Sequence, residues 1–451
     1  MRYIADLHTH SRFSRACSPK LTLENIDAWC QIKGVDIVST ADFTHPVWFE
    51  ELKKKLEPSK YPGLYQLKFG LHPDFPPPVV LPKKPTLFML GTEIACIYSQ
   101  GGHCQGEKKK VRRVHNCIYA PSLEIAEEIN KTLAGRGCKL ASDGRPIVGL
   151  SSKELLKIIL EADKRCVLIP AHAWTPWFSI FGSYSGFDSI EECFEEMAPH
   201  IFAIETGISS DPPMNWRVSQ LDNIALVSHS DIHSLPNLGR EADVFEGGEK
   251  DLSYDNIIKA IRQAAPDKLK SRSKTEFKML GTVEFIPAEG RYHYDGHRVC
   301  KKRMHPLETK KRGGICPICK KPVTVGVLSR AEELADRPEG EHPRTIPEFW
   351  GLVELDKIIA EAMGLRGRAA KSVQDIYWDL VVKSGTEMDL LLNMPVEALK
   401  KIAPVRLVEA IHRVRLGKVE VEPGYDGEYG VVKIFSEREQ KEWKGEQKSL
   451  F

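Results

Sequence analysis

Short apolar runs recur along the first 290 residues, and each leads into a histidine or an acidic residue. Apolar runs of four to eight residues are typical of strands covered on both faces, as in a parallel sheet with helices outside. We therefore predict strands whose polar residues lie at their ends. The six segments are residues 3–10, 88–93, 111–115, 167–172, 202–205 and 226–233.

Segments with helical periodicity alternate with these strands. Residues 21–34 place apolar side chains every three or four positions and end in a glycine, which often terminates a helix. Four further segments each begin at a serine, a residue that can cap a helix start. They are Ser122–Leu133, Ser151–Ala162, Ser189–Met197 and Ser253–Ala264. Repeated strand–helix–strand units predict an α/β fold with parallel pairing, closed as a β/α barrel over residues 1–290.

Composition describes an ordinary folded protein. The chain has 451 residues, 42% hydrophobic and 28% charged, with a formal net charge of +2. This length predicts two to four domains. The eleven cysteines are mostly scattered singly, which indicates reduced thiols rather than a disulfide framework. No run of 18 apolar residues and no leader segment is evident, so we predict a cytoplasmic protein without membrane contact.

Imidazole and carboxylate groups follow the predicted strands. A β/α barrel builds its active site at the C-terminal ends of its strands, so these groups are expected to converge there. Any one histidine alone is better explained as a hydrogen-bonded core or loop residue. Together they suit zinc, magnesium or manganese, and they predict metal-assisted hydrolysis of a phosphoester. The candidate catalytic and metal-binding residues are His8, His10, Glu93, His115, His172, Asp231 and His233.

A second metal signal lies beyond the barrel. His297 and Cys300 are separated by fifteen residues from Cys316 and Cys319, which is the spacing of a closed tetrahedral zinc site. Four protein ligands leave no open position, so this zinc is expected to be structural. We assign residues 291–330 to a small zinc-binding module.

Positive charge concentrates in this module. Residues 291–330 hold eleven Lys or Arg against two acids, a local net charge of +9. Such a patch suits contacts to a phosphate backbone, although a solvated charged face remains the alternative. A shorter basic stretch, residues 108–113, precedes His115. The candidate DNA contacts are Lys109, Arg112, Lys301, Lys302 and Arg303.

Aromatic residues cluster after His172, among Gly, Ser and Pro, with neither strand nor helix periodicity. Such a loop at the metal-bearing face can stack on an extruded base. It can equally pack as a hydrophobic plug onto the barrel, and both interpretations stay open. The candidate base contacts are Trp174, Trp177, Phe178, Phe181 and Tyr184.

The remaining chain divides into two parts. Residues 331–415 show helical periodicity and predict a helical domain, for which ordinary helix packing is a better explanation than duplex binding. Residues 416–451 form a polar tail whose last ten residues are expected to be disordered.

The order of the metal motifs resembles that of the polymerase and histidinol phosphatase (PHP) superfamily. The matching motifs are Asp6-Leu-His-Thr-His10, Gly91-Thr-Glu93, His115, Ala171-His172 and Ser230-Asp-Ile-His233. A PHP region followed by a zinc-binding module, a helical segment and a polar tail is similar to the endonuclease Q family. The resemblance implies a distorted PHP-type barrel, a zinc-ribbon-like module and a metal-dependent DNA repair endonuclease. That family cuts 5′ of deaminated bases (uracil, hypoxanthine and xanthine) and of abasic sites.

The resemblance also implies how ligands are shared between metals. It places His8, His10, Glu93 and Asp231 around one ion and Glu93, His115 and His172 around a second. A third site would use His233. Asp42 stands where that family commonly has a histidine, and His45 is a competing candidate.

The last residues resemble a peptide that binds the sliding clamp. Gln447 is followed by Leu450 and Phe451, which would dock into a clamp pocket. Two other functions stay open: a small-molecule phosphoesterase, supported by the barrel alone, and a non-catalytic DNA-binding adaptor. The first leaves the basic zinc module unexplained, and the nearly complete ligand set argues against the second.

Overall fold

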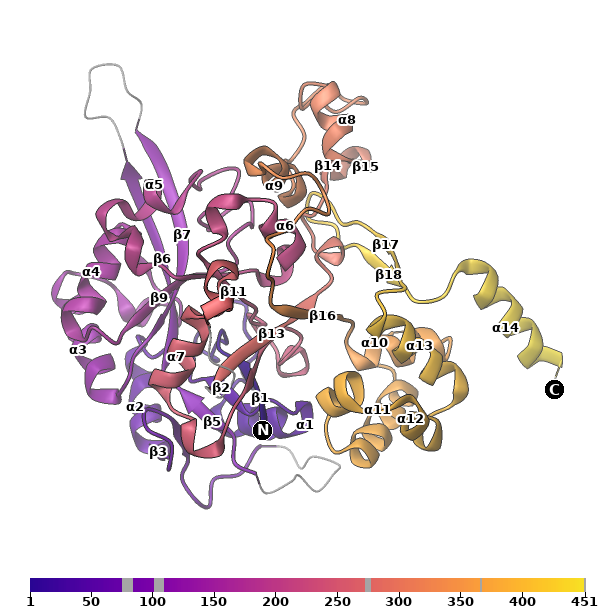
Figure 1. Cartoon of the computed structure of the whole chain (residues 1–451), viewed down its shortest axis with the longest axis horizontal. Coiled ribbons are helices and arrows are strands. Elements are labelled where there is room, and N and C mark those ends of the chain that lie inside the picture. The colour runs from indigo at the N-terminus through magenta and orange to yellow at the C-terminus, as the bar shows by residue number, and fades with distance from the viewer. Residues whose placement is uncertain (75–83, 101–108, 272–276, 366, 450–451) are drawn as a thin grey trace.

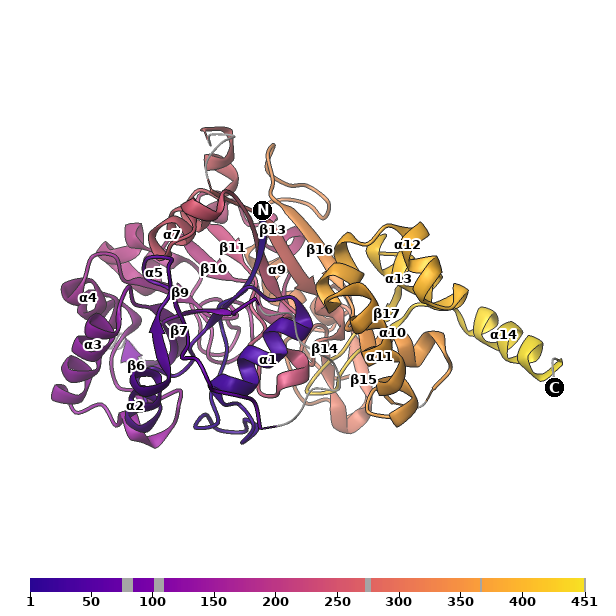
Figure 2. The same cartoon turned by 90° about the horizontal axis from the view of Figure 1, so that it is seen from below.

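The computed structural model describes residues 1–74, 84–100, 109–271, 277–365 and 367–449. It shows an α/β protein with a large N-terminal part, a small projecting lobe and a group of helices (Figure 1). The lobe contains β14 (Asp295–His297), β15 (Lys302–Met304) and α8 (Pro306–Lys311). In both views the last helix, α14 (Glu437–Ser449), lies at the end of the molecule farthest from the N-terminal part (Figure 2).

A mixed eight-stranded sheet runs through the N-terminal part. Its order is β16-β13-β12-β1-β2-β5-β4-β3. The central strand β1 pairs in parallel with β2 and antiparallel with β12, and its last four residues are buried. The strands, in sheet order, are Glu348–Leu352, Lys278–Phe285, Ala242–Glu246, Arg2–Asp6, Ile37–Ser39, Leu87–Met89, Tyr65–Leu67 and Leu56–Pro58. The residues that follow β1 therefore emerge in the middle of the molecule.

A second sheet has the order β8-β6-β7-β9, and a short parallel pair, β10–β11, forms a separate sheet next to β9. Strands β6 (Gly91–Gln100) and β7 (Lys110–Tyr119) form a long antiparallel hairpin. The others are β8 (Ile147–Val148), β9 (Val167–Pro170), β10 (Ala203–Glu205) and β11 (Ala225–Val227).

The strand pairing differs from the expected parallel barrel. β6, β7 and β9 pair antiparallel, as do β1, β12 and β13. Parallel neighbours need a crossover of about a dozen residues or more, usually a helix, whereas only residues 101–109 separate β6 from β7. Within the described residues the strands form separate sheets rather than one closed ring of hydrogen bonds.

The helices of the N-terminal part begin where the sequence indicates. Ser122, Ser151, Ser189 and Ser253 each accept a hydrogen bond from a backbone N–H in the first turn of the helix that follows, which confirms the four predicted caps. Gly34 ends the first helix in the left-handed conformation, with φ 84°. The helices are α1 (Leu23–Lys33), α2 (Pro46–Lys55), α3 (Leu123–Gly135), α4 (Ser152–Ala162), α5 (Ile190–Phe194), α6 (Pro212–Trp216) and α7 (Tyr254–Arg262).

The predicted helical region is present but shares its core with the N-terminal part. It contains α10 (Leu355–Ala362), α11 (Lys371–Ser384), α12 (Val396–Ile402) and α13 (Val405–Arg415), and α9 (Val327–Leu334) precedes it. One cluster of buried apolar side chains continues from Ile26 in α1 to Ile358 in α10. Within the described residues, no helix combines the length and apolarity that crossing a membrane requires.

The polar C-terminal tail is folded over most of its length. Strands β17 (Glu420–Glu422) and β18 (Val431–Lys433) form a hairpin that returns to the lobe. The Tyr294 N–H donates to the Gly424 carbonyl (2.9 Å), and the Arg298 N–H donates to Asp426 (2.6 Å). Helix α14 includes residues 442–449, which belong to the segment predicted to be disordered. Arg438 pairs with Glu442 one turn on, a spacing that supports a helix.

Candidate active site

Four side chains from three distant segments form the first ligand group. His8 and His10 follow β1, Glu93 lies in β6, and Asp231 follows β11. One ligand atom from each of these residues lies within 4.8 Å of the others. The His10 Nε2 atom lies 2.9 Å from Asp231 Oδ1 and 3.2 Å from Glu93 Oε2. The predicted first metal group is therefore assembled in space.

The donor atoms of this group suit a cation. His8 Nε2, His10 Nε2 and Asp231 Oδ1 are buried and have no hydrogen-bond partner among the described residues. Buried polar atoms are rarely left unpaired, since each one costs about 1–3 kcal/mol. Imidazole nitrogens and carboxylate oxygens together are a ligand set for zinc or manganese. The residues present thus fit a divalent metal ion.

Glu93 joins this group to a second one. Its Oε1 atom lies 2.6 Å from His115 Nδ1 and 3.2 Å from His172 Nε2, whereas its Oε2 atom faces His8 and His10. A carboxylate that presents one oxygen to each group is placed to bridge two ions. The predicted second group is therefore also assembled in space.

The strand hairpin explains the position of Glu93 and His115. Both lie inside β6 and β7, not at strand ends as the sequence predicted. Glu93 pairs with Cys117, and Ala95 pairs with His115, so Glu93 and His115 are diagonal neighbours on one face. The hairpin register sets the separation of these two ligands.

Strained backbone positions the other ligands. Asp231 and His172 have φ values of 46° and 29°, a region that non-glycine residues rarely adopt and that often marks functional sites. Gly207 lies against His172, and a Cβ atom at Gly207 would lie 2.6 Å from His172 Cβ. A side chain at this glycine would displace His172.

Buried carboxylates hold the histidines by their other ring nitrogens. Glu205 contacts His8 Nδ1 (2.9 Å) and accepts the backbone N–H of His172 (2.9 Å). Asp42 contacts His10 Nδ1 (3.2 Å). Such partners select the ring orientation and tautomer of a metal-binding histidine. Sequence reasoning placed Glu205 at a strand end but did not assign it to the site.

Asp42 and His45 do not lie in any of the ligand groups found among the described residues. One Asp42 oxygen faces His10, and the other accepts hydrogen bonds from Ser11 and Ser14. His45 instead caps α2, and its Nδ1 atom accepts the Trp48 N–H. We therefore assign Asp42 to orienting His10, in place of the predicted metal ligation.

His233 stands beside the first group without joining it. Its ring lies 5.1 Å from the ring of His10, and its side chain is 36% exposed. Its Nδ1 atom lies 2.9 Å from the Asp231 carbonyl oxygen. A third metal site remains a prediction.

The electrostatic surroundings set the protonation states of the ligands. Burial acts to raise the pKa of Glu93, but the neighbouring His115, Arg145 and His8 hold this pKa well below its usual range. Burial also lowers the pKa of His115 to about 4, which leaves the imidazole neutral. Metal binding needs deprotonated ligands, and Glu93 and His115 meet this condition at neutral pH. Burial acts to lower the pKa values of His8 and His10, but the groups around them, Glu93 among them, raise both pKa values well above the usual histidine range, so a metal ion would have to displace their protons.

Arg145 is a site residue that sequence reasoning missed. Its Nη1 atom lies 3.0 Å from Glu93 Oε2, and its side chain is 23% exposed. The Glu93 charge raises the pKa of Arg145, and this effect outweighs burial, which acts to lower that pKa. No motif surrounds this arginine in the sequence, so only the three-dimensional fold identifies it.

The aromatic loop, residues 173–188, divides into buried and accessible rings. Trp174 and Phe181 are 1% and 0% exposed, and the Trp174 Nε1–H donates to Asn215. These two rings pack as the predicted plug, and burial excludes them from stacking on a base. Trp177 is half-buried and stacks on Tyr184 at 4.7 Å, and Tyr184 is 46% exposed. An accessible aromatic face remains beside the buried part.

This accessible face adjoins the second ligand group. The ring of Phe178 lies 4.8 Å from the ring of His115, and the His115 N–H donates to the Phe178 carbonyl. Phe178 has a φ of 62°, so its backbone is held in an unusual conformation. Together Trp177, Phe178 and Tyr184 form a ring-lined surface next to His115.

Two arginines hold the aromatic loop, and both contact Phe187. Arg112 is 5% exposed, donates to the Gly186 carbonyl and lies 3.8 Å from the ring centroid of Phe187. Arg330, in α9, donates to the carbonyls of Phe181 and Phe187, both at 3.0 Å. Arg112 is therefore an internal support for the loop, in place of the predicted DNA contact.

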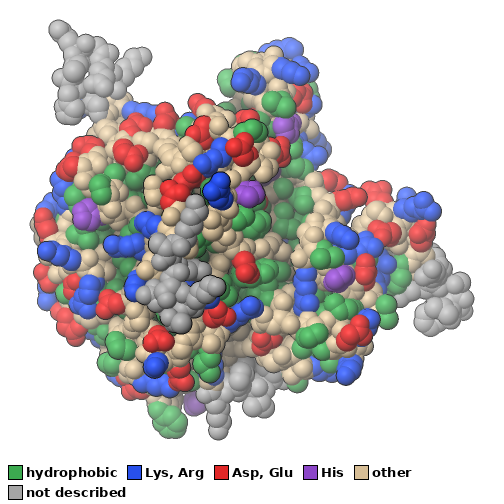
Figure 3. Space-filling view, viewed as in Figure 1, with side chains coloured by type: hydrophobic (Ala, Val, Ile, Leu, Met, Phe, Trp, Pro, Cys, Tyr) green, Lys and Arg blue, Asp and Glu red, His purple; other side chains and the backbone are tan. Residues whose placement is uncertain are grey.

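The other predicted basic residues lie near or at the surface. Lys109, which precedes β7, is exposed, as are Lys301 and Arg303 of the lobe. Lys302 is half-buried, and its Nζ atom lies 3.4 Å from Glu308. Lys and Arg side chains gather on the lobe at the upper right of the molecule (Figure 3).

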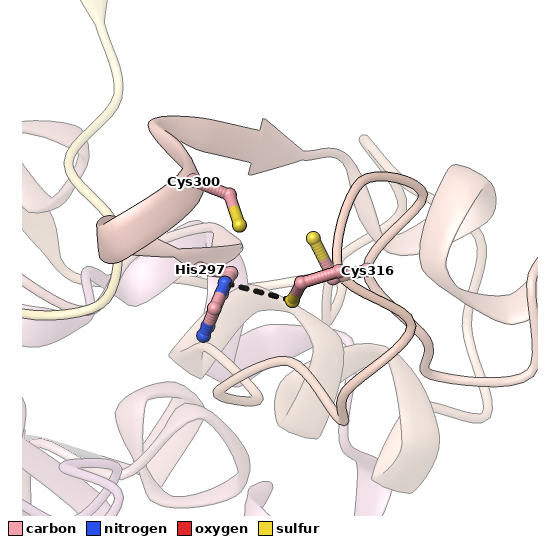
Figure 4. A group of neighbouring side chains, drawn as sticks. His297, Cys300 and Cys316 are labelled. Atoms are coloured by element: carbon pink, nitrogen blue, oxygen red, sulfur yellow. Dashed lines mark hydrogen bonds between the residues drawn. The ribbon is translucent and has the colours of Figure 1, made fainter.

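The zinc module brings its four predicted ligands together. The ligand atoms of His297, Cys300, Cys316 and Cys319 lie within 4.8 Å of one another. Figure 4 shows His297, Cys300 and Cys316 converging, and His297 Nδ1 lies 3.4 Å from Cys319 Sγ. Backbone N–H groups of Cys319 and Ile318 lower the pKa of Cys316 to about 7, which favours the thiolate that zinc binds.

Of the three residues predicted to bind a sliding clamp, Leu450 and Phe451 lie outside the described residues.

The Gln447 backbone lies within α14, and nothing further is described of its side chain. Binding to a sliding clamp stays a prediction. The zinc cluster and the two ligand groups that share Glu93 are the features on which a function rests.

Comparison with known proteins finds one matching family model and a relative with a similar sequence. A family model described as the MJ0043 C-terminal domain matches residues 354–418. An uncharacterised protein of Methanocaldococcus jannaschii, MJ0043, is 32% identical over 285 residues, which are 62% of this chain and 33% of that protein. The chain thus spans about a third of the length of this curated relative.

Two solved structures are similar over nearly the whole chain. One is the lesion-specific endonuclease PfuEndoQ from Pyrococcus furiosus, with a TM-score of 0.79, 26% identity and coverage of 97% of this chain and 96% of that one. The other is endonuclease Q in complex with a 27-mer duplex substrate that has an abasic lesion at the active site. Its TM-score is 0.77, with 26% identity and coverage of 97% and 98%.

Proposed function

We propose that this chain, an endonuclease Q-type protein, is a metal-dependent DNA repair endonuclease. It hydrolyses the phosphodiester 5′ of deaminated bases (uracil, hypoxanthine and xanthine) and of abasic sites. The observation that supports the chemistry is the pair of ligand groups joined by Glu93, with unpaired buried donor atoms in the first group. The two structural neighbours, one with an abasic duplex, support the substrate class.

Divalent ions bound in these two groups would supply an activated water and would neutralise charge on the phosphate. Glu93 holds the groups at a fixed separation through its two oxygens. Asp42 and Glu205 keep the His10 and His8 rings turned toward the centre. Arg145 lies beside Glu93 and presents positive charge where a phosphate oxygen would approach. No side chain is required to form a covalent intermediate.

The rest of the chain provides lesion and backbone contacts. Trp177, Phe178 and Tyr184 line a face beside His115 on which an extruded base would stack. Lys109 on the hairpin and Lys301 and Arg303 on the lobe would contact phosphates.

Finer features belong to the same proposal. The sheets around the ligand groups correspond to a distorted PHP-type barrel. The active-site ions are zinc, magnesium or manganese, His233 serves a third ion, and one structural zinc is held by the lobe. The chain works in the cytoplasm and contacts the sliding clamp through Gln447, Leu450 and Phe451.

A nicking assay tests the function. The full chain is incubated with duplexes that contain one uracil, one hypoxanthine or one abasic site, with zinc, magnesium or manganese. We expect one cut, 5′ of the lesion, and none in the undamaged duplex. Release of phosphate from small esters without nicking would show a phosphoesterase. Binding without either reaction would show an adaptor.

A further inference from the structure

A cavity of about 490 Å³ lies between the N-terminal part and the helical region. We call it the Trp29–Trp378 pocket. Helix α1 contributes Trp29 and Lys33, and α11 contributes Tyr377 and Trp378. Helices α1 and α11 lie side by side in both views (Figures 1 and 2). A cavity of this size is in the range of small-molecule and cofactor sites, about 300–1,000 Å³.

Aromatic rings and a cation line one side of the pocket. The Trp29 and Trp378 rings lie 6.1 Å apart, and both side chains are half-buried, so part of each ring is accessible. Tyr377 lies edge-on to Trp378 at 5.3 Å. The Lys33 Nζ atom lies within 6 Å of the Trp29 and Tyr377 rings. Such surfaces bind flat aromatic groups by stacking.

Asp356 and Arg368 line the other side, and each has one buried polar atom without a hydrogen-bond partner among the described residues. Asp356 is 8% exposed, and its Oδ1 atom has no hydrogen-bond partner among the described residues. Arg368 Nη2 is likewise buried and unpaired, although Arg368 Nε donates to Asp356 Oδ2 (2.8 Å). An acceptor beside a donor matches the edge of a nucleobase, which presents a donor next to an acceptor.

The pocket shares a chain segment with the metal centre. Ser234, Pro236 and Asn237 form its rim, and Ser234 directly follows His233. The His233 ring lies 5.1 Å from that of His10. The segment that lines the pocket is therefore continuous with the segment that carries His233 and Asp231.

We propose that the Trp29–Trp378 pocket receives a second nucleobase of the bound DNA, separate from the one at the aromatic loop. The base stacks on Trp29 and Trp378 and pairs its edge with Asp356 and Arg368. This inference rests on the proposed function, because it needs DNA at the metal centre.

Photocrosslinking tests the assignment. The full chain with Asp231→Asn is bound to abasic duplexes that carry 5-iodouracil at one position near the lesion, on either strand, and is irradiated. Mass spectrometry should map crosslinks from one position to Trp378 or Trp29. Crosslinks from every position that map only to the aromatic loop or the zinc module would overturn the proposal. Equal labelling by free 5-iodo-deoxyuridine monophosphate would also overturn it, because the occupant would then be a soluble nucleotide.

Substitutions provide a second measurement. In the same background, Trp378→Ala should weaken binding of the lesion duplex about tenfold, by loss of one stacked base. Trp378→Phe should remain within about twofold. Asp356→Asn should weaken binding, whereas Asp379→Asn on the exposed side of α11 should not. Thermal unfolding midpoints establish that each variant is folded, and unchanged affinity in folded Trp378→Ala would contradict the pocket.

The outcomes separate this inference from the proposed function. A chain that crosslinks through Trp378 but never nicks any lesion duplex would refute the nuclease alone. A chain with normal nicking, no crosslink at Trp29 or Trp378 and unchanged affinity in Trp378→Ala would refute the pocket alone.

Discussion

The metal centre and the zinc module both bring metal-binding side chains together, but these side chains are held in different ways. The ligands of the metal centre come from segments as far apart as His8 and Asp231, and two large apolar clusters surround them. The zinc ligands lie within residues 297–319, and the buried apolar cluster there contains only Met304, Cys316 and Val323. A large core can position ligands before a metal arrives. A core of three side chains cannot, so we expect a bound metal ion to stabilise the module.

The largest expected effect follows from removing a ligand of the preformed centre. Asp231→Asn should lower nicking of a uracil duplex by at least about 1,000-fold, because the first ion loses an anionic ligand and its position. DNA binding and the thermal unfolding midpoint should change little, since the surrounding core is intact. Gel nicking and fluorescence anisotropy provide the two readouts. Normal turnover would show that the ligand set is wrong.

The opposite behaviour is expected for the zinc module. Cys316→Ser should release zinc and unfold residues 297–323, which should weaken DNA binding about 100-fold through lost phosphate contacts. Most far-ultraviolet circular dichroism should persist, because the N-terminal part has its own core. Zinc content by atomic absorption confirms the loss. A zinc-free variant that binds DNA as tightly as the parent would remove the distinction between the two regions.

A milder change to the metal centre tests its supporting hydrogen bonds. Glu205→Gln retains the shape of the side chain but removes the charge that holds His8 and the His172 backbone. Nicking and metal affinity should fall about 30-fold, within the range found for partners of metal ligands. Metal titration by calorimetry measures the affinity. A matched variant at an exposed acid, Glu397→Gln, should have no effect.

A contact between the two regions should have a smaller effect. Arg330 joins α9, which follows the zinc module, to the carbonyls of Phe181 and Phe187 in the aromatic loop. Arg330→Ala should raise KM for lesion duplexes about tenfold while zinc content stays the same, because charge-assisted hydrogen bonds of about 1.5–3 kcal/mol are lost. Arg330→Lys should recover part of this loss. Arg438→Ala, at an exposed ion pair in α14, is the control.

The smallest effect on intrinsic cutting is expected at the C-terminus. Deletion of residues 446–451 should leave basal nicking unchanged and abolish stimulation by a sliding clamp. The comparison is made with and without clamp in the same nicking assay. Stimulation that survives the deletion would contradict clamp binding through this segment.

The sequence indicated the ligands better than their surroundings. His8, His10, His172 and Asp231 follow short buried strands, and this local pattern is readable without a structure. Glu93 and His115 lie inside a hairpin whose register no local pattern reveals, and the role of Arg145 depends entirely on tertiary contacts. The predicted parallel barrel differs from the observed sheets for the same reason, because a buried strand has the same sequence pattern whether its neighbours are parallel or antiparallel.

Loop residues were hardest to assign individually. Trp174 and Trp177 are separated by two residues, yet one is buried and the other accessible. A loop lacks the periodicity that tells inner from outer positions in a helix or strand. Arg112 and Lys109 show the same difference, because a basic stretch does not reveal which of its members turns inward.

The C-terminal hairpin affects how the protein can be shortened. The family match ends at residue 418, which suggests a convenient end point for a trimmed protein. However, the loop between β17 and β18 is hydrogen-bonded to the lobe, because Gly424 accepts from the Tyr294 N–H and Asp426 accepts from the Arg298 N–H. A chain that ends at residue 418 would lack the hairpin that packs against the lobe, and the lobe has only a small apolar core of its own. A trimmed protein intended to retain zinc should therefore extend to at least residue 436.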